Sequence, residues 1–232
     1  MTRQACLLFY LKFPERGKVK TRLARDIGDE HAVELYCCFI RDMLETLAQI
    51  PQQICLCYAP QTAEPRFRRW LEGDFVYLPQ HGNNLGERMG NSFQGAFRLG
   101  FERVVLIGSD LPDLPAQYVE MAFERLESYK SVIGPSGDGG YYLLGFRRET
   151  FVPEVFQDIG WSQSSVYEET LTKLTRHGTD FLALPVWHDI DNLSELHQWY
   201  SRQQVQQGGT SRAVRTHAYV HHHLQAYILE RC

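Results

Sequence analysis

The amino-acid sequence predicts an α/β protein whose mostly parallel sheet is covered by helices on both faces. Strand-like and helix-like segments alternate from Ala5 to Ser128, and this order is typical of such a sheet. Val104–Ile107 is a short, continuous apolar run rich in β-branched residues, as expected of a strand buried on both faces. A chain of 232 residues is also long enough to bury a large core.

The spacing of apolar residues predicts the order of the elements. We expect strands at Ala5–Leu11, Gln53–Ala59, Phe75–Leu78, Val104–Ile107, Ser131–Pro135 and Tyr141–Gly145, and an extended stretch at Asp180–Leu184. We expect a long helix capped by Asp29, and further helices at Pro65–Leu71, Glu87–Leu99, Pro115–Ser128 and Ser164–Arg176. Asn192 and Glu195 form a capping box for a helix that ends near Gln204. The sequence therefore predicts one domain over residues 1–204, then a linker and C-terminal helical tail over 205–232, with the flexible part at Gln206–Ser211.

Composition argues against several classes of protein. The formal net charge of −4 gives no support to a general nucleic-acid or membrane-surface role. The apolar run Ala5–Leu11 is too short for a membrane span, and the six cysteines show no metal-binding spacing. Reduced thiols in a cytoplasmic protein are the simplest interpretation. Any phosphate-binding site must therefore depend on a local group of basic residues and not on the overall charge of the chain.

Asp110 is the first candidate for a metal ligand. It follows the apolar strand after only Gly108 and Ser109, and Pro112 and Pro115 end the extended stretch. Ligands of open α/β sheets sit beyond the carboxyl ends of the strands, and a carboxylate there can hold Mg²⁺ that bridges to substrate phosphates. The alternative is that Asp110 only stabilises the turn and caps the helix that begins near Pro115.

Asp189 and Asp191 are the second candidates. In an extended segment they point to the same side, and two like charges so close favour a bound cation. The alternative is an acidic surface turn in which Asp191 lies near the start of a helix.

A basic loop, Lys12–Arg25, directly follows the first strand. Pro14 and Gly17 turn the backbone, so its amides and ammonium groups could converge on phosphate oxygens. The pattern is neither a Walker A loop nor a dinucleotide-binding glycine motif, and solvated side chains on an ordinary loop are the alternative. The basic residues concerned are Lys12, Lys18, Lys20 and Arg22.

Two glycine-containing turns could approach a base or a sugar, because glycine lets the backbone come close to a flat ligand. Tyr141 or Tyr142 could stack on that ligand or donate a hydrogen bond, although hairpin chemistry alone would explain the second turn. The residues expected to bind there are Gly82, Leu85, Gly86, Arg88, Asp138, Gly139, Gly140 and Tyr141. Consecutive histidines cannot all face one metal from a helix, so His221–His223 favours a solvated helix face over a nickel or zinc site.

Together these segments resemble the DUF2064 family, also called rSAM/selenodomain-associated transferase 1, of the GT-A nucleotide-diphospho-sugar transferase superfamily. The matching stretches lie between Lys12 and Leu196 and read KFPERGKVKTRL, GNNLGERM, GSDLP, GPSGDGGYYLLG, IGWSQSSV and DIDNLSEL. The resemblance implies a Rossmann-like GT-A fold, a three-layer α/β/α sandwich. It also implies a metal-binding carboxylate at Asp110, a second at Asp191 or Asp189, and phosphate contacts from the basic loop. Asn84 and Asn192-Leu193 depart from the family pattern, which often has Asp and Thr-Pro at these places.

The leading hypothesis is a metal-dependent transferase that takes a nucleotide sugar as donor and passes the glycosyl group to a small-molecule acceptor. Asp110, Asp191 and Asp189 would hold Mg²⁺ or Mn²⁺, and Lys20 would stabilise charge on the leaving phosphate. Ser109 is expected among the nucleotide-binding residues. The alternatives are a nucleotidyltransferase that releases pyrophosphate and a non-catalytic nucleotide-binding protein. The oligomeric state is open, and a homodimer is one option.

Overall fold

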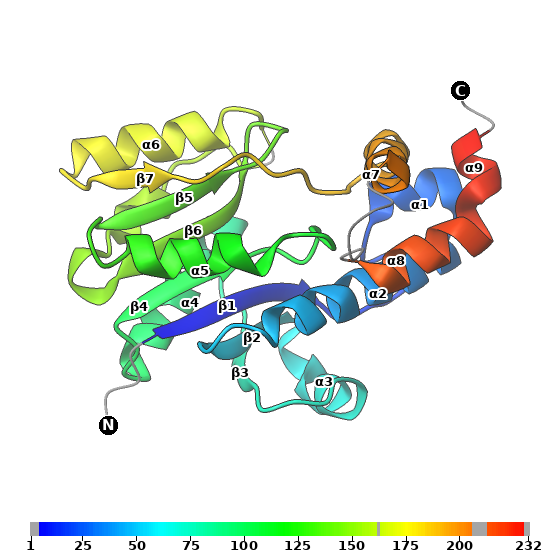
Figure 1. Ribbon diagram of the computed structural model, residues 1–232. Coiled ribbons are helices and arrows are strands. Elements are labelled where there is room, and N and C mark those ends of the chain that lie inside the picture. Colours follow the sequence, from blue (N-terminus) through cyan, green and yellow to red (C-terminus); the bar gives the residue numbers. More distant parts are fainter. Residues whose placement is uncertain (1–4, 162, 206–212, 230–232) are drawn as a thin grey trace. The chain divides into compact units, whose positions relative to one another are not determined.

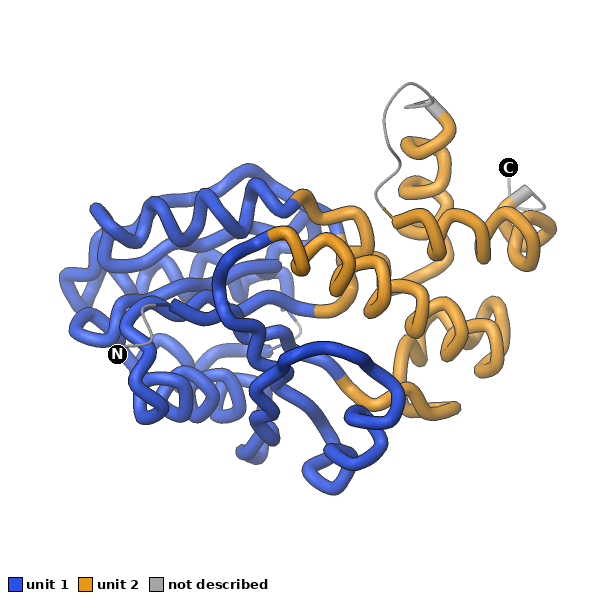
Figure 2. Tube along the Cα trace, turned by 60° about the horizontal axis from the view of Figure 1, so that its bottom comes forward, with its two compact units in different colours: residues 1–11, 50–108, 116–188 blue, residues 12–49, 109–115, 189–232 orange. Residues whose placement is uncertain are grey.

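Figure 1 shows the computed structural model, which describes residues 5–161, 163–205 and 213–229. The chain divides into two compact units, coloured separately in Figure 2. Unit 1 comprises Met1–Leu11, Ile50–Gly108 and Ala116–His188, and unit 2 comprises Lys12–Gln49, Ser109–Pro115 and Asp189–Cys232. Among the described residues, no helix is both long enough and apolar enough to cross a membrane.

Unit 1 is built on a seven-stranded sheet, counted over the described residues, with the order β3-β2-β1-β4-β6-β5-β7. The strands are β1 (Ala5–Lys12), β2 (Gln53–Ala59), β3 (Val76–Pro79), β4 (Arg103–Ile107), β5 (Ser131–Pro135), β6 (Tyr141–Arg147) and β7 (Phe181–Ala183). The pairs β1–β4, β2–β3 and β5–β7 are parallel, whereas β6 runs antiparallel to β4 and β5. The prediction of a mostly parallel sheet is confirmed.

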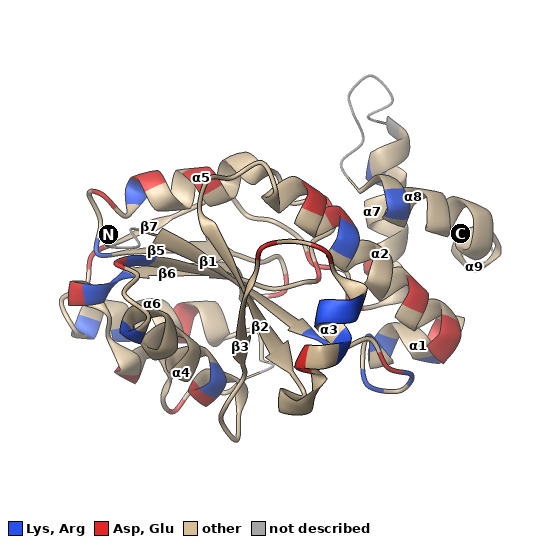
Figure 3. Ribbon diagram, turned by 90° about the horizontal axis from the view of Figure 1, so that it is seen from below, with Lys and Arg blue, Asp and Glu red and all other residues tan. Residues whose placement is uncertain are grey.

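Helices cover both faces of this sheet. Helices α4 (Leu85–Arg98) and α6 (Val166–Arg176) lie on one face and α5 (Ala116–Arg125) on the other, as Figure 3 shows. On the α4 side, the ring of Phe93 stacks against Phe151 and Phe156, with centroid distances of 5.5 and 5.8 Å. A short helix, α3 (Glu64–Trp70), follows β2. The predicted three-layer α/β/α architecture is therefore confirmed.

Unit 2 consists of helices and connecting segments. Its helices are α1 (Thr21–Ile27), α2 (Asp29–Leu47), α7 (Leu193–Val205), α8 (Val214–Tyr219) and α9 (Gln225–Leu229), with a π-helical turn at Val220–Leu224 between the last two. Helix α8 packs against α2. The capping box before α7 is confirmed, since Asn192 Oδ1 accepts from the Glu195 N–H at 3.0 Å and Glu195 Oε2 accepts from the Asn192 N–H at 3.1 Å.

Two expectations about unit 2 are wrong. The predicted loop Lys12–Arg25 turns helical at Thr21, because Leu23 and Ile27 are apolar, four residues apart and both buried. Asp29 does not cap α2 but is its first residue. The N-cap is Gly28, which makes no side-chain capping hydrogen bond and whose φ of 84° allows the chain to turn between α1 and α2. The predicted linker Gln206–Ser211 lies outside the described residues.

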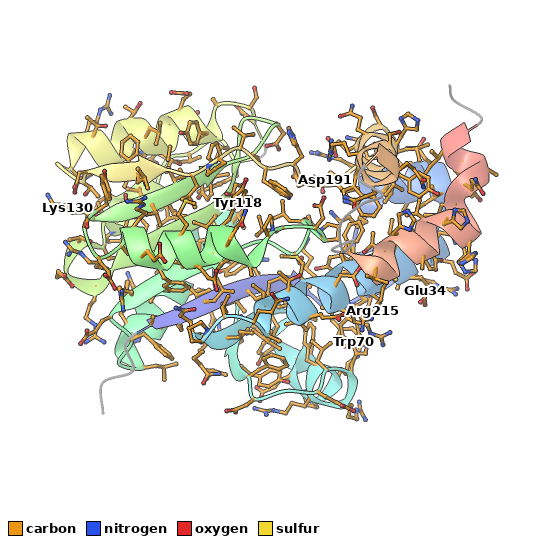
Figure 4. All side chains as sticks on the ribbon, viewed as in Figure 1. Glu34, Trp70, Tyr118, Lys130, Asp191 and Arg215 are labelled. Carbon is orange, nitrogen blue, oxygen red and sulfur yellow. The ribbon has the colours of Figure 1, made fainter. Side chains whose placement is uncertain are left out.

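The C-terminal segment is attached to α2 by a buried carboxylate. Asp42 exposes 3% of its surface and accepts hydrogen bonds from the backbone N–H groups of Arg215 and Thr216, at 3.1 and 2.7 Å. These groups belong to the first turn of α8, whose own N-cap, Ala213, provides no side-chain acceptor. Asp42 thus supplies the helix cap from a different element. Figure 4 labels Arg215 on α8.

Candidate functional site

The ammonium group of Lys20 joins two carboxylates from distant parts of the sequence. Lys20 Nζ lies 2.6 Å from Asp110 Oδ1, 3.0 Å from Asp191 Oδ1 and 2.7 Å from the carbonyl oxygen of Ile190. The side chain of Lys20 exposes only 3% of its surface. An ammonium group has three protons to donate, and here each has an acceptor. All four residues belong to unit 2, so the cluster is complete within one compact unit.

The local backbone explains why these side chains meet. Asp110 follows the end of β4 by three residues, and its carbonyl oxygen accepts a hydrogen bond from the Ile190 N–H at 3.0 Å. Asp191 precedes α7, beside which Figure 4 labels it. Lys20 precedes α1 in a left-handed conformation with φ 46° and ψ 42°, which is uncommon for a lysine. Its three polar contacts offset the cost of that conformation.

The charges in the cluster alter one another's protonation. Burial opposes charging of Lys20, yet the two carboxylates raise the pKa of its ammonium group above the usual value. Burial also raises the pKa of Asp110, against the attraction of Lys20. For Asp191 burial is outweighed by Lys20 and Arg22, and its pKa is lowered. Lys20 and Asp191 are therefore charged at neutral pH.

The other basic residues of the predicted set lie closer to solvent. The Arg22 guanidinium lies 3.6 Å from Asp191 Oδ2, and its side chain exposes 61% of its surface. Lys12 and Lys18 are exposed, and the Lys18 N–H donates to the Glu15 carbonyl in the turn of the loop. Figure 3 shows basic residues on α1 and on the loop before it. The structure therefore divides the predicted phosphate-binding set into one buried lysine and three more exposed cations.

The carboxylate oxygens of Asp110 and Asp191 are the kind of ligand that a hard divalent cation prefers. Lys20 is a stand-in cation, since it already holds one oxygen of each carboxylate. Within the described residues, no group of three or more His, Cys, Asp or Glu side chains could hold a metal ion. Two carboxylates suit Mg²⁺, which commonly uses one or two protein carboxylates and takes its remaining ligands from water and substrate phosphates. The role of Asp189 as a metal ligand stays a prediction.

Tyr36 is a buried polar residue of this region that sequence analysis missed. Its hydroxyl accepts from the Lys12 backbone N–H at 3.0 Å and lies 2.8 Å from Ser109 Oγ, next to Asp110 in the chain. Burial raises its pKa, so the hydroxyl stays protonated. In sequence Tyr36 lies on the apolar stripe of α2 and is indistinguishable from a core residue. The only signal available was its hydroxyl on an otherwise apolar face.

The first glycine-containing turn, in unit 1, has clear structural roles. Arg88 Nε donates to the Gly82 carbonyl at 3.0 Å, and Gly82 has φ 141° with no room for a Cβ beside Glu87. Gly86 packs directly against the indole of Trp161 and the Phe156 carbonyl, whereas Leu85 is 46% exposed. Binding of a nucleotide by these residues stays a prediction.

The second turn is held by its own polar groups. Asp138 accepts from the Gly140 N–H at 2.9 Å and from the Ser136 hydroxyl, and Gly139, with φ 89°, lies against the backbone of Ser164. Tyr141 directs its hydroxyl at the sulfur of Met89, 3.8 Å away, and burial raises its pKa. The contacts of Asp138 with Ser136 and Gly140 are those expected of a hairpin turn, and a ligand role for Asp138, Gly139, Gly140 and Tyr141 stays a prediction.

The three consecutive histidines lie in unit 2 on the π-helical turn, and all three are exposed. His221 Nδ1 lies 2.9 Å from the hydroxyl of Tyr200. Among the described side chains they belong to no group of three or more His, Cys, Asp or Glu that could hold a metal ion.

Comparisons with known proteins find similar sequences and structures. The model of a family of uncharacterized proteins conserved in bacteria, DUF2064, matches residues 43–163. A crystal structure of a proposed nucleotide-diphospho-sugar transferase from Desulfovibrio desulfuricans G20 is similar, with 40% identity and a TM-score of 0.91 over 99% of this chain and 98% of that one. No curated protein matches the chain significantly.

Two more distant structures share the fold. CMP:2-keto-3-deoxy-manno-octonic acid synthetase in complex with CTP has a TM-score of 0.55 and 10% identity, over 87% of this chain and 99% of that one. A manganese complex of a protein from Mycobacterium tuberculosis H37Rv has a TM-score of 0.50 and 12% identity, over 85% and 98%. At such low identity the likeness concerns the fold alone.

Proposed function

The chain belongs to the DUF2064 family, and from this membership and its charged cluster we propose that it is a transferase acting on a nucleotide-diphospho-sugar. In this proposal it passes the glycosyl group to a small-molecule acceptor with the help of a divalent cation. One observation carries the proposal: Asp110 and Asp191 converge on the single ammonium group of Lys20. The description of the Desulfovibrio relative, at 40% identity, supports the substrate class.

In the proposed reaction each charged residue has a distinct role. Asp110 and Asp191 would hold Mg²⁺ or Mn²⁺, a choice supported by their donor chemistry and by the manganese in the Mycobacterium structure. The cation would supply charge neutralisation at the leaving phosphate. Lys20 would keep the two carboxylates together before substrate arrives and then donate to a phosphate oxygen. Arg22, exposed and already beside Asp191, would add positive charge for the second phosphate.

Nucleotidyl transfer is the second candidate. The fold is shared with a synthetase solved in complex with CTP, and in that chemistry an acceptor attacks the α-phosphorus and pyrophosphate leaves. In glycosyl transfer the acceptor attacks the sugar carbon and a nucleoside diphosphate leaves. The identity of the released product therefore separates the two candidates. The cluster of Lys20, Asp110 and Asp191 suits both, because each requires stabilisation of a leaving phosphate.

The proposal is tested by ligand-dependent thermal stability. Nucleotides and nucleotide sugars are screened with and without Mg²⁺, and a ligand present at a hundred times its dissociation constant should stabilise the fold by about 2.7 kcal/mol. Asp110→Asn should abolish the Mg²⁺-dependent part of the shift, while the control Asp180→Asn, an exposed carboxylate that accepts from the Lys130 N–H, should keep it. No Mg²⁺-dependent ligand in the whole set would refute the proposal.

Turnover separates the enzyme from a non-catalytic nucleotide-binding protein. In an enzyme, Asp110→Asn should lower metal-dependent turnover of the ligand found in the screen by about a hundredfold or more, as is typical when one key electrostatic group is removed. A binding protein would show no turnover in the wild type, and its nucleotide affinity would barely change in the variant.

A further inference from the structure

A chain of hydrogen bonds leads from the end of β1 to the residue before Asp110. The Lys12 N–H donates to the Tyr36 hydroxyl at 3.0 Å, and that hydroxyl lies 2.8 Å from Ser109 Oγ. Tyr36 exposes 3% of its surface and Ser109 exposes 5%. A side chain of α2 thus contacts both the last residue of β1 and the segment that follows β4. Lys12, Tyr36 and Ser109 all belong to unit 2.

Counting the available protons limits which atom can be the donor in each of these hydrogen bonds. Because the Lys12 amide can only donate, the Tyr36 oxygen must accept from it. If Ser109 donated to Tyr36, the phenolic proton would have no acceptor among the contacts of this buried hydroxyl, and if Tyr36 donated to Ser109, the Ser109 proton would be the one without an acceptor among these contacts. Only the second arrangement leaves its remaining proton on Ser109, beside Asp110, where a ligand could accept it, and we adopt it: the Lys12 N–H donates to Tyr36, and the Tyr36 O–H donates to Ser109. The Ser109 proton is then left to donate to another acceptor.

We propose that Tyr36 is a positioning residue that directs the Ser109 hydroxyl toward a phosphate oxygen of the nucleotide substrate. The inference rests on the proposed function, since the phosphate is the one that Asp110 and Lys20 would meet. With its own acceptor side occupied by Tyr36, the Ser109 hydroxyl is a donor beside a metal-binding carboxylate. The chemical class that uses such a donor is an oxyanion, and an apolar or cationic group would leave it unsatisfied.

Two single variants and their combination test this role. The probe is inorganic pyrophosphate with Mg²⁺, measured by titration calorimetry, because it presents the phosphate oxygens without requiring the base to be known. Tyr36→Phe keeps the ring and removes only the hydroxyl, and we expect about tenfold weaker binding, the size of one hydrogen bond to a charged group. Ser109→Ala should weaken binding by at least as much.

The double variant distinguishes positioning from a structural role. If Tyr36 acts through Ser109, Tyr36→Phe combined with Ser109→Ala should bind pyrophosphate as Ser109→Ala alone does. Two losses that multiply would overturn the inference, as would wild-type affinity in either single variant. Should Tyr36→Phe fail to fold, Ser109→Ala still decides, because wild-type affinity without that hydroxyl is incompatible with the proposal.

A control variant completes the design, and the possible results separate failure of this inference from failure of the proposed function. Tyr200→Phe removes the hydroxyl of another buried tyrosine of unit 2, one bonded to His221 Nδ1 at 2.9 Å, and should leave pyrophosphate affinity unchanged. If the wild-type protein binds neither pyrophosphate nor any nucleotide with Mg²⁺, the proposed function fails and this inference fails with it. If the wild type binds and the two losses multiply, only the role of Tyr36 is lost.

Discussion

Replacing Lys20 by methionine should make the protein bind Mn²⁺ more tightly. The ammonium group of Lys20 lies 2.6 and 3.0 Å from the carboxylates of Asp110 and Asp191, in the position that a cation shared by them would take. A divalent ion must therefore displace this group before it can use the same oxygens. Lys20→Met keeps an apolar stem of similar length and removes the competing charge.

The size of the effect follows from Coulomb's law. If the ammonium stayed in place, it would lie about 4 Å from the ion, where each pair of unit charges costs about 4 kcal/mol at an effective dielectric constant of 20. Rotation of Lys20 away from the carboxylates, and the 38% exposure of Asp110, reduce this cost. We take about 1.4 kcal/mol as a lower bound, which corresponds to tenfold tighter binding.

The assay is a titration of the ligand-free protein with Mn²⁺, followed by electron paramagnetic resonance of the free ion. Arg22→Gln is the control, since this guanidinium is 61% exposed, lies 3.6 Å from Asp191 and is screened by solvent and salt, so that affinity should change by less than about threefold. Lys20→Met should also melt at a lower temperature without Mn²⁺ and recover with it. Equal or weaker Mn²⁺ binding by Lys20→Met would refute the reasoning.

Three further predictions concern stability. Asp42→Ala should lower the free energy of unfolding by about 2 kcal/mol, because the two backbone N–H groups at the start of α8 lose their buried cap; an unchanged urea midpoint would contradict this. The pKa of Asp191 is held below its ordinary value of 3.8, so its stabilisation is complete above that pH and lost as the pH falls below it. In urea unfolding, Asp191→Asn should therefore be less stable than the wild type at pH 6, and the difference in free energy of unfolding should shrink toward pH 2. The same difference at pH 6 and pH 2 would contradict this prediction. Gly139→Ala should destabilise the protein by about 2 kcal/mol or more, because φ is 89° and a Cβ would collide with the Ser164 carbonyl oxygen. The control Gly95→Ala, in α4 with nothing within 4 Å, should instead stabilise it by up to about 1 kcal/mol in the same assay, and a loss comparable to that of Gly139→Ala would remove the steric explanation.

The strands were the most predictable part of the fold. Gln53–Ala59 and Ser131–Pro135 have the bounds expected from sequence, because short apolar runs between turn residues leave no room for a helix. The antiparallel direction of β6 was harder to predict. The turn Asp138–Gly140 indicates a hairpin between β5 and β6, but the pairing of β6 with β4 depends on the whole sheet. Helix α1 was missed because its apolar face consists of two residues in an otherwise basic segment.

Sequence analysis named both the carboxylates and Lys20 as candidate site residues, but it did not predict that the Lys20 side chain is buried between the carboxylates. Asp110 follows a parallel strand, so the general rule for such sheets predicted its place. Lys12, Lys18 and Lys20 look alike in the sequence, and the structure shows that the side chain of Lys20, a residue in the left-handed conformation, is the buried one. Tyr36 shares its spacing with core residues of α2, and hydrophobic periodicity cannot tell a hydroxyl that orients a serine from one that only fills space.

The measurement that addresses the central claim most directly is the anomalous scattering of Mn²⁺ in crystals grown with the nucleotide found in the screen. The account predicts a peak about 2.1 Å from a carboxylate oxygen of both Asp110 and Asp191, with Lys20 Nζ moved from between them to a phosphate oxygen. A structure in which nucleotide and manganese bind elsewhere, while Lys20 still bridges the two carboxylates, would contradict it.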